Sequence, residues 1–260
     1  MSDIDDARRA VALMDLTELG DAANEDAVLD LCRRASGSAD VPRVAAVCVW
    51  PRHVMTARGA LQPGRGHGRD RVRIATVINF PSGEGSPEMA AAGAHGALLN
   101  GADEIDLVMP YKAFLNGDTE SAARAIRAVK DAMPAGKTLK VILETGAYPD
   151  LVSVRAASEL AIGAGADFIK TSTGKIAVGA TPEAARTMLE AIRDSGRRVG
   201  FKPSGGIRTL ADARVYLTLA DSIMGADWAR PETFRFGASG LLAALAGVIA
   251  GKDVAAGKGY

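Results

Sequence analysis

The stretch Ala-Asp-Phe-Ile-Lys-Thr-Ser-Thr-Gly-Lys at residues 166–175 joins a short apolar run to a lysine. Positions 166–169 are apolar apart from Asp167, and the run has the length of a buried strand. Lys170 falls where this strand ends, before a polar turn over 171–174. Burial disfavours the ammonium form of lysine, and a lysine of lowered pKa attacks carbonyl groups at neutral pH. The stretch therefore predicts a strand end that carries either a nucleophile or a lysine that points into solvent.

The rest of the chain repeats this pattern of a short apolar run, a turn and a helix. Ser86-Pro87-Glu88 and Thr181-Pro182-Glu183 are clear helix starts, with a capping hydroxyl, a first-turn proline and an acidic residue. Strict alternation over 260 residues predicts an α/β fold, a (β/α)8 TIM barrel, with an open doubly wound sheet as the alternative. The expected strands span residues 12–17, 44–50, 73–80, 104–109, 139–144, 166–170, 199–202 and 233–236.

The domain organisation follows from the absence of any linker or break in composition. We expect a single barrel domain over residues 1–250. The tail at 251–260 is rich in glycine, alanine and lysine and ends in Tyr260, and we expect it to be mobile.

Composition and charge exclude several classes of protein. The chain has 31 basic and 31 acidic residues without a basic block, so nothing indicates nucleic-acid binding. It has no apolar run of the roughly 18 residues that a membrane helix needs. Cys32 and Cys48 lack metal-ligand spacing, and we expect neither a metal nor a cofactor. The acidic amino terminus does not resemble a targeting peptide, which favours a cytoplasmic protein.

Two lysines mark the expected active site, because barrel enzymes place their sites at the carboxyl ends of the strands. Lys170 ends the sixth expected strand and Lys202 ends the seventh, so the two should be neighbours. Two ammonium groups at such a short distance repel each other, and each lowers the pKa of the other. One lysine can then be a neutral nucleophile. In the alternative, one lysine points inward and the other caps a helix outside the barrel.

Acidic residues inside apolar strands are a second anomaly. Asp106 lies within Glu-Ile-Asp-Leu-Val at 104–108, and a buried carboxylate must be paired. Lys140, in an equally apolar strand, is a plausible partner. Asp106 could therefore relay protons or form a purely structural ion pair, and the pattern alone leaves both open. Asp15, between Met14 and Leu16, is a weaker case of the same kind.

Glycine-rich turns suggest an anion site. Pro-Ser-Gly-Gly at 203–206 follows the seventh expected strand, and Gly-Ala-Ser-Gly at 237–240 follows the eighth. Barrels often bind phosphate at these two loops, through backbone amides and a helix amino end. Gly174 and Lys175 could add a positive charge. The alternative is that the glycines serve only the geometry of the turns.

Together these runs resemble the deoxyribose-phosphate aldolases, a family of class I aldolases. The resemblance spans nearly the whole chain in order and implies a (β/α)8 barrel. It also implies the reversible, metal-free cleavage of 2-deoxy-D-ribose 5-phosphate to acetaldehyde and D-glyceraldehyde 3-phosphate. The matching runs are Met14-Asp15-Leu16-Thr17, Gly101-Ala102-Asp103-Glu104-Ile105-Asp106, Leu143-Glu144-Thr145-Gly146, 166–175, Gly200-Phe201-Lys202-Pro203-Ser204-Gly205-Gly206 and Phe236-Gly237-Ala238-Ser239.

The resemblance implies a role for each matching residue. Lys170 would form the Schiff base, Lys202 would depress its pKa, and Asp106 would relay protons through water. Tyr260 resembles a tail tyrosine that helps proton transfer at the acetaldehyde carbon in some members. Relatives often have a second serine where this chain has Gly240, which removes a hydroxyl from the phosphate site. The residues implied in substrate binding are Asp15, Thr173, Gly174, Lys175, Gly205, Gly206, Gly237 and Ser239.

Two other functions remain open at this point. A transaldolase-like barrel acting on another sugar phosphate would also form a Schiff base on lysine. A barrel that binds a phosphorylated ligand without catalysis would keep the glycine loops, but it would have no reason for two inward lysines. The expected partners are small molecules, a sugar phosphate and an aldehyde, with no nucleic acid or membrane, and a homodimer is possible.

Overall fold

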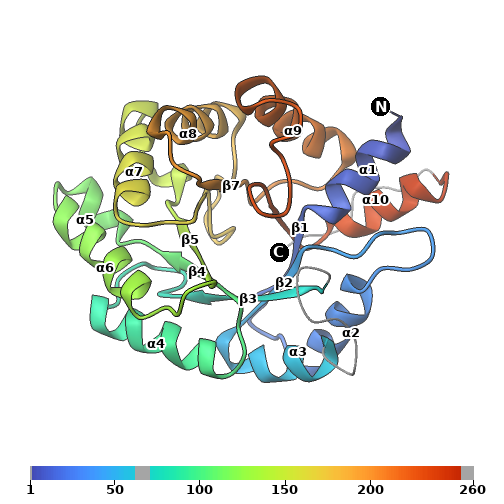
Figure 1. The fold of residues 1–260 in the computed structure, drawn as a ribbon, viewed down its shortest axis with the longest axis horizontal. Helices are drawn as coiled ribbons and strands as arrows, with labels where there is room; N and C mark the ends of the chain where they lie inside the picture. Colours follow the sequence, from blue (N-terminus) through green and yellow to red (C-terminus); the bar gives the residue numbers. More distant parts are fainter. Residues whose placement is uncertain (1, 62–70, 253–260) are drawn as a thin grey trace.

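The computed structural model describes residues 2–61 and 71–252, which form a ring of parallel strands surrounded by helices (Figure 1). The strands are hydrogen-bonded in the order β7-β6-β5-β4-β3-β2-β1-β8, so each strand lies beside its neighbour in sequence. This order is that of a barrel built from repeated strand–helix units. The strands are β1 (Met14–Glu18), β2 (Ala46–Val49), β3 (Arg73–Ile78), β4 (Glu104–Val108), β5 (Thr138–Ile142), β6 (Phe168–Lys170), β7 (Gly200–Lys202) and β8 (Phe236–Ala238).

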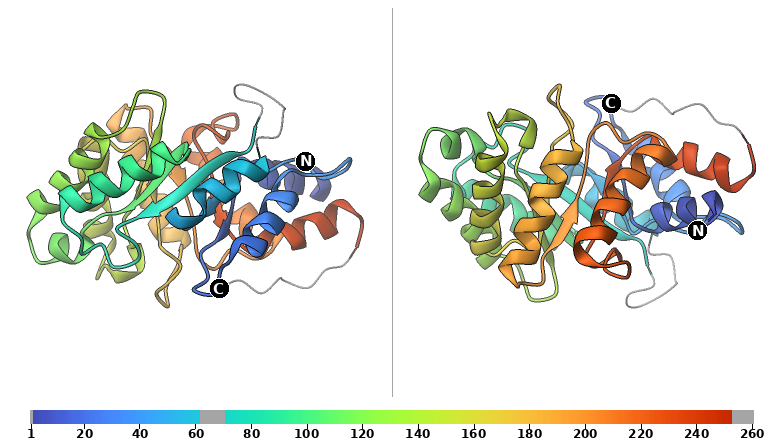
Figure 2. Two further views of the ribbon diagram at one scale, coloured as in Figure 1. Left: turned by 90° about the horizontal axis from the view of Figure 1, so that it is seen from below. Right: turned by 90° about the horizontal axis from the view of Figure 1, so that it is seen from above.

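The helices pack around the outside of the strands, as the side views show (Figure 2). The starts of α4 and α8 agree with the two helix starts predicted from the sequence, whereas the short helix α5 was not predicted. The helices are α1 (Asp3–Ala12), α2 (Glu25–Ala35), α3 (Val54–Leu61), α4 (Pro87–Leu99), α5 (Tyr111–Leu115), α6 (Thr119–Asp131), α7 (Leu151–Gly163), α8 (Pro182–Ser195), α9 (Leu210–Met224) and α10 (Leu241–Ile249), with 3-10 turns η1 (Pro51–His53) and η2 (Thr145–Ala147).

The sheet closes on itself between the last strand and the first. Strand β8 pairs with β1, where Gly237 lies opposite Asp15. On its other side, two isolated bridges join the β7 region to the β8 region, Phe201 with Phe234 and Ser204 with Gly237. These contacts confirm the predicted barrel and rule out the open sheet.

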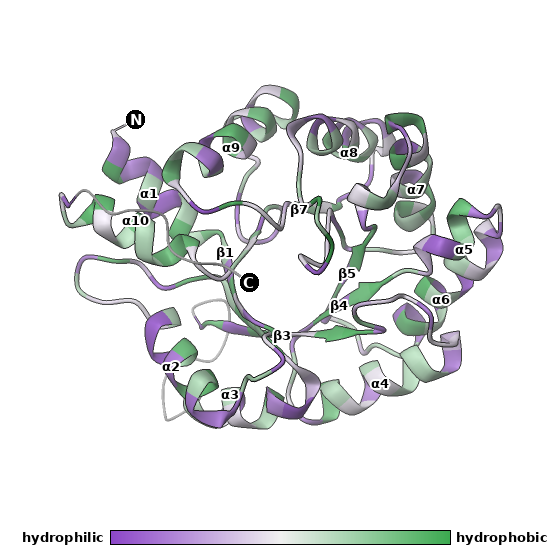
Figure 3. Cartoon of the chain, turned by 180° about the vertical axis from the view of Figure 1, so that it is seen from behind, coloured by the Kyte–Doolittle hydropathy of each residue, from purple (hydrophilic) through white to green (hydrophobic). Residues whose placement is uncertain are grey.

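Alternation along each strand separates the apolar core from the interior of the barrel. In β4, Ile105 and Leu107 join the same buried hydrophobic core as helical residues such as Ile126. Glu104 and Asp106 point to the opposite face, because successive strand residues alternate, and they too are buried. Figure 3 shows the ends of β4 and β5 in the colour of hydrophobic residues, among helices of mixed polarity. The charged side chains therefore gather inside the barrel, away from the apolar packing between strands and helices.

The helix starts follow the capping chemistry predicted from the sequence. The Ser86 hydroxyl accepts a hydrogen bond from the Met89 amide at 3.2 Å, with a proline in the first turn. The Thr181 hydroxyl does the same for the Ala184 amide at 3.2 Å. These caps satisfy amides that would otherwise lack partners at the helix start. They fix where the chain turns from a strand end into the next helix.

The eighth strand lies later in the chain than predicted. The sequence predicts residues 233–236, whereas β8 runs over Phe236–Ala238. In the sequence Gly237 suggests a turn, but it lies within the strand. A glycine is needed there because the segment with Lys202 and Ser204 comes unusually close to its backbone. A Cβ atom at Gly237 would lie 2.6 Å from the Cβ of Ser204 and 3.1 Å from Cε of Lys202. The glycine therefore serves close packing beside the second lysine.

Two expectations concern membranes and the end of the chain. None of the helices in the described parts of the chain is long and apolar enough to cross a membrane. Tyr260 and most of the tail expected at 251–260 lie outside the described residues.

Candidate active site

Lys170 and Lys202 lie side by side at the carboxyl ends of β6 and β7. Their Cα positions are paired in the parallel ladder, and both side chains are buried inside the barrel. The sequence predicted this juxtaposition from the two strand ends alone. The alternative in which one lysine caps a helix outside the barrel is wrong.

Asp106 links the two lysines. One of its carboxylate oxygens, Oδ2, accepts hydrogen bonds from Lys170 Nζ at 2.9 Å and from Lys202 Nζ at 2.8 Å. The other oxygen accepts from Lys140 Nζ at 2.9 Å. Lys140 is the partner suggested by the sequence, and its Cα is paired with that of Asp106 between β5 and β4. A single buried carboxylate therefore binds three lysines from three consecutive strands.

Two further acids and an arginine extend this cluster across the barrel. Asp15 on β1 lies 2.5 Å from Lys202 Nζ and 2.6 Å from the guanidinium of Arg235. Glu104 lies 2.5 Å from Lys140 Nζ and 2.9 Å from Arg235. Asp15, which the resemblance implies in substrate binding, is thus fully engaged in ion pairs. Sequence reasoning missed Glu104 and Arg235, although both are charged residues in or beside expected apolar strands.

The cluster contains one more basic group than acidic groups. Four basic side chains share the buried space with three carboxylates: Lys140, Lys170, Lys202 and Arg235 with Asp15, Glu104 and Asp106. An unbalanced buried charge is costly, and a lysine can remove that charge by losing its proton. A neutral Lys170 leaves three positive and three negative groups.

Lys170 is the lysine whose surroundings favour the neutral form. Burial lowers the pKa of Lys170, the positive charge of Lys202 lowers it further, and Asp106 opposes both. For Lys202, burial also disfavours the charge, but Asp106 and Asp15 outweigh it and raise the pKa. The net shift in the pKa of Lys202 is therefore opposite to that of Lys170. Its two carboxylate partners keep Lys202 positively charged.

This asymmetry predicts how the nucleophile responds to pH. Because the pKa of Lys170 is lowered, its neutral fraction at a given pH exceeds that of a solvent-exposed lysine, whose pKa is about 10.4. We expect the rate of imine formation with an aldehyde to rise with pH and to level off below that pKa. Borohydride trapping at a series of pH values measures the profile. A rate that continues to rise in parallel with exposed lysines would contradict the prediction.

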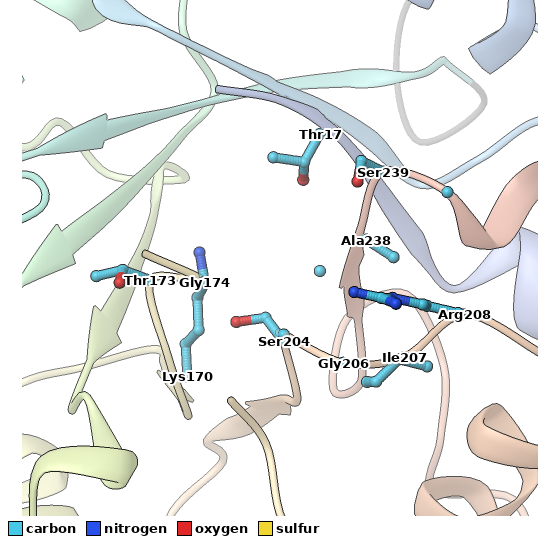
Figure 4. A pocket seen from close by; sticks show the side chains of 13 residues that line it. Thr17, Lys170, Thr173, Gly174, Ser204, Gly206, Ile207, Arg208, Ala238 and Ser239 are labelled. Atoms are coloured by element: carbon cyan, nitrogen blue, oxygen red, sulfur yellow. The ribbon is translucent and has the colours of Figure 1, made fainter. Parts of the chain in front are cut away.

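A pocket opens directly above Lys170, and Figure 4 shows Lys170 and Ser204 pointing into it with Thr17 and Ser239 across the gap. The loops after β6, β7 and β8 form most of its wall. Helix α10 begins immediately after the last of these loops, so its positive end lies at the pocket. The lining residues are Thr17, Lys170, Thr173, Gly174, Ser204, Gly205, Gly206, Ile207, Arg208, Gly237, Ala238, Ser239 and Gly240.

Most of the residues implied in substrate binding line this pocket, but Asp15 and Lys175 are not among its described lining residues. The Lys175 ammonium donates to the Leu19 carbonyl at 2.9 Å and lies 3.6 Å from the Asp21 carboxylate. Arg208 supplies a cation that sequence reasoning missed. Its position between the Gly205-Gly206 turn and the cap Thr209 is the signal that could have found it.

These features define a class of protein. The (β/α)8 barrel buries a lysine of lowered pKa at its catalytic end, under loops suited to phosphate. This arrangement suits Schiff-base chemistry on a phosphorylated carbonyl compound. The chain belongs to the DeoC/LacD family of aldolases, whose family model matches residues 9–256.

Individual relatives agree with this assignment. A deoxyribose-phosphate aldolase from Agrobacterium fabrum is 51% identical over 255 residues, which cover 98% of this chain and 96% of that protein. The structure of a deoxyribose phosphate aldolase from Aeropyrum pernix, described as tetrameric, is 27% identical with a TM-score of 0.71, covering 95% of this chain and 92% of its own. A candidate deoxyribose-phosphate aldolase from Toxoplasma gondii shares the fold, with a TM-score of 0.84 at 24% identity over 96% of this chain and 99% of that one.

Proposed function

We propose that this protein is a class I aldolase that reversibly cleaves 2-deoxy-D-ribose 5-phosphate to acetaldehyde and D-glyceraldehyde 3-phosphate. One observation carries the proposal: Lys170 shares a single pocket with the glycine loops after β7 and β8. The pocket therefore offers a nucleophile for the aldehyde carbon and an anion site for the phosphate at the other end of the sugar. The 51% identity with the Agrobacterium enzyme supports the same substrate.

The reaction begins at Lys170. Its neutral amine attacks C1 of the open-chain sugar to give a carbinolamine. Uptake of one proton and loss of water then give an iminium ion, which carries the positive charge previously absent from Lys170. Asp106, at 2.9 Å from Lys170 Nζ, stabilises that new charge. The fourth positive charge of the buried cluster thus appears only when the covalent intermediate forms.

Cleavage then uses the iminium ion as an electron sink. A base removes the proton of the C3 hydroxyl, the C2–C3 bond breaks, and its electrons move into the C1–C2 enamine. Glyceraldehyde 3-phosphate leaves, the enamine is protonated at C2, and water releases acetaldehyde and Lys170. We assign the proton transfers to a water held near Asp106 and Lys202, since these groups lie 2.8 Å apart beside the nucleophile.

The phosphate end is assigned to the loops opposite Lys170. Gly205, Gly206, Gly237 and Ser239 line the pocket there, and backbone amides at a helix amino end suit a phosphate. Arg208, at the same wall (Figure 4), supplies a cation that can bind phosphate through two nitrogens.

Reductive trapping tests this function. We expect borohydride with acetaldehyde to leave a two-carbon adduct on Lys170, located by peptide mass mapping. Release of acetaldehyde from 2-deoxyribose 5-phosphate, measured with a coupled dehydrogenase, checks the substrate. An adduct on Lys202 would reverse the roles of the lysines. Absence of an adduct on any lysine would point to a barrel that binds a phosphorylated ligand without catalysis.

We also propose that the protein works as a homo-oligomer in the cytoplasm. Cys32 and Cys48 are both free thiols, as suits a reducing compartment. The Aeropyrum relative is described as tetrameric, while the sequence leaves a homodimer possible without deciding the oligomeric state. Light scattering of the purified protein distinguishes monomer, dimer and tetramer.

A further inference from the structure

Glu144 is a buried acid that the mechanism does not use. It lies two residues after the end of β5, and its backbone has the left-handed conformation, with φ of 61°. This conformation is unfavourable for a non-glycine residue. Its side chain is fully buried. Such strained positions persist where the surrounding contacts hold them, and they concentrate at functional sites.

The contacts that hold Glu144 come from the loop after β6. Its carboxylate accepts a hydrogen bond from the Thr173 backbone amide at 3.1 Å and another from the Thr173 hydroxyl at 2.5 Å. The same hydroxyl accepts from the Lys175 amide at 3.0 Å. The hydroxyl proton is therefore directed to Glu144, and an oxygen lone pair is directed to Lys175. One carboxylate thus determines the shape of the turn over residues 173–175.

This turn is part of the pocket wall. Thr173 and Gly174 line the pocket together with Lys170 and the glycine loops. Gly174 has a positive φ of 79°, and its Cα lies 3.8 Å from the position of a Cβ built on Gly205. The turn that Glu144 holds therefore packs directly against the loop assigned to phosphate.

The charge of Glu144 is not balanced by a direct partner. Within the described parts of the chain, Glu144 takes no part in the ion pairs that connect the three lysines. Burial raises its pKa, and the two hydrogen bonds from Thr173 oppose that rise. Burial and the negative charge of Glu144 both raise the pKa of Tyr148 and of Tyr111, and neither phenol adds a positive charge. The hydrogen bonds from Thr173 are thus its main stabilising contacts.

We propose that Glu144 is a positioning residue for the phosphate end of the substrate. Through Thr173 it holds the turn over 173–175 in the shape that completes the anion pocket, without touching the reacting carbons. This inference rests on the proposed function and adds a determinant of phosphate specificity to it. The consequence is that Glu144 matters for a phosphorylated sugar and much less for the same sugar without phosphate.

Glu144→Gln tests this role, because glutamine keeps the shape but loses the charge and one acceptor. We expect KM for 2-deoxyribose 5-phosphate to rise about tenfold, the usual order for a lost charge-assisted hydrogen bond, with kcat largely retained. Inhibition by inorganic phosphate should weaken by a similar factor. The value of kcat/KM for unphosphorylated 2-deoxyribose should fall far less, and acetaldehyde trapping on Lys170 should continue.

Second-site variants separate positioning from general damage. Thr173→Val should reproduce the phosphate-specific loss, Thr173→Ser should retain tight binding, and the Glu144→Gln/Thr173→Val double variant should lose little more than either single variant. Glu159→Gln on the surface of α7 is the matched control for charge removal. Equal losses with both sugars, or an unchanged KM for the phosphorylated sugar, would overturn the proposal. Failure of the wild-type protein to trap acetaldehyde would instead overturn the proposed function.

Discussion

Replacement of Lys170 by alanine is expected to abolish aldol cleavage, with kcat falling by at least about 10⁴-fold, as when a covalent nucleophile is removed. The reason is chemical: without this amine no iminium forms, and the C2–C3 bond has no electron sink. Lys202 cannot substitute, because Asp15 and Asp106 at 2.5 and 2.8 Å raise its pKa and hold its proton. Steady-state assays and the trapping experiment measure the two consequences together.

The fold should survive this change. Lys170→Met keeps most of the volume, and Asp106 retains Lys140 and Lys202 as partners, so we expect the free energy of unfolding to change by less than about 1.5 kcal/mol. Urea denaturation of both variants measures this. Lys112→Met, which removes an exposed lysine paired with Glu84, is the control and should retain full activity. Appreciable cleavage by Lys170→Ala would disprove the nucleophile assignment.

Asp106→Asn should impair both stability and catalysis. The substitution leaves four buried basic groups facing two carboxylates, and removing one partner of a buried ion pair costs about 3–5 kcal/mol. We also expect kcat to fall by about 10²–10⁴-fold, the usual contribution of a group that takes part in proton transfer. Urea denaturation and steady-state kinetics at pH 7 measure the two losses. Asp194→Asn, at a surface pair with Arg155, should cause neither.

The pH dependence of stability and of imine trapping separates the structural role of Asp106 from its role in catalysis. Its pKa is held well below the ordinary value, since the three lysines outweigh the effect of burial. A carboxylate of depressed pKa stabilises the fold above its unfolded pKa, near 3.9, and the contribution is lost as pH falls. The stability difference between Asp106→Asn and wild type should therefore shrink in acid.

The Asp106→Asn substitution should favour imine formation on Lys170 while it slows cleavage. Asp106 raises the pKa of Lys170, so the asparagine variant should have more neutral Lys170 at a given pH. Its trapping profile should move to lower pH even though cleavage is slow. A trapping profile that moves to higher pH would contradict the assigned charge balance.

The amino-acid sequence by itself determined the barrel and the position of its catalytic end. The signals for both are local, and each can be recognised within a few residues. They are the periodicity of strands and helices, the prolines and glycines at turns and helix ends, and capping residues such as Ser86 and Thr181. Lys170 and Lys202 could be paired because parallel neighbouring strands end at the same edge of the sheet. The partner of Asp106 could be suggested for the same reason, since Lys140 lies on the adjacent strand.

Only the tertiary structure decided which charged groups meet across the barrel. Arg235 contacts Asp15 and Glu104, which are distant in sequence, because closure and strand stagger place the three at one depth inside the barrel. The later position of β8 and the left-handed backbone of Glu144 likewise depend on neighbouring segments. Local periodicity carries no information on these distances. The sequence therefore predicted where the nucleophile lies, whereas the difference between the pKa values of the two lysines comes from the fold, because each pKa depends on all the charges that the barrel brings together.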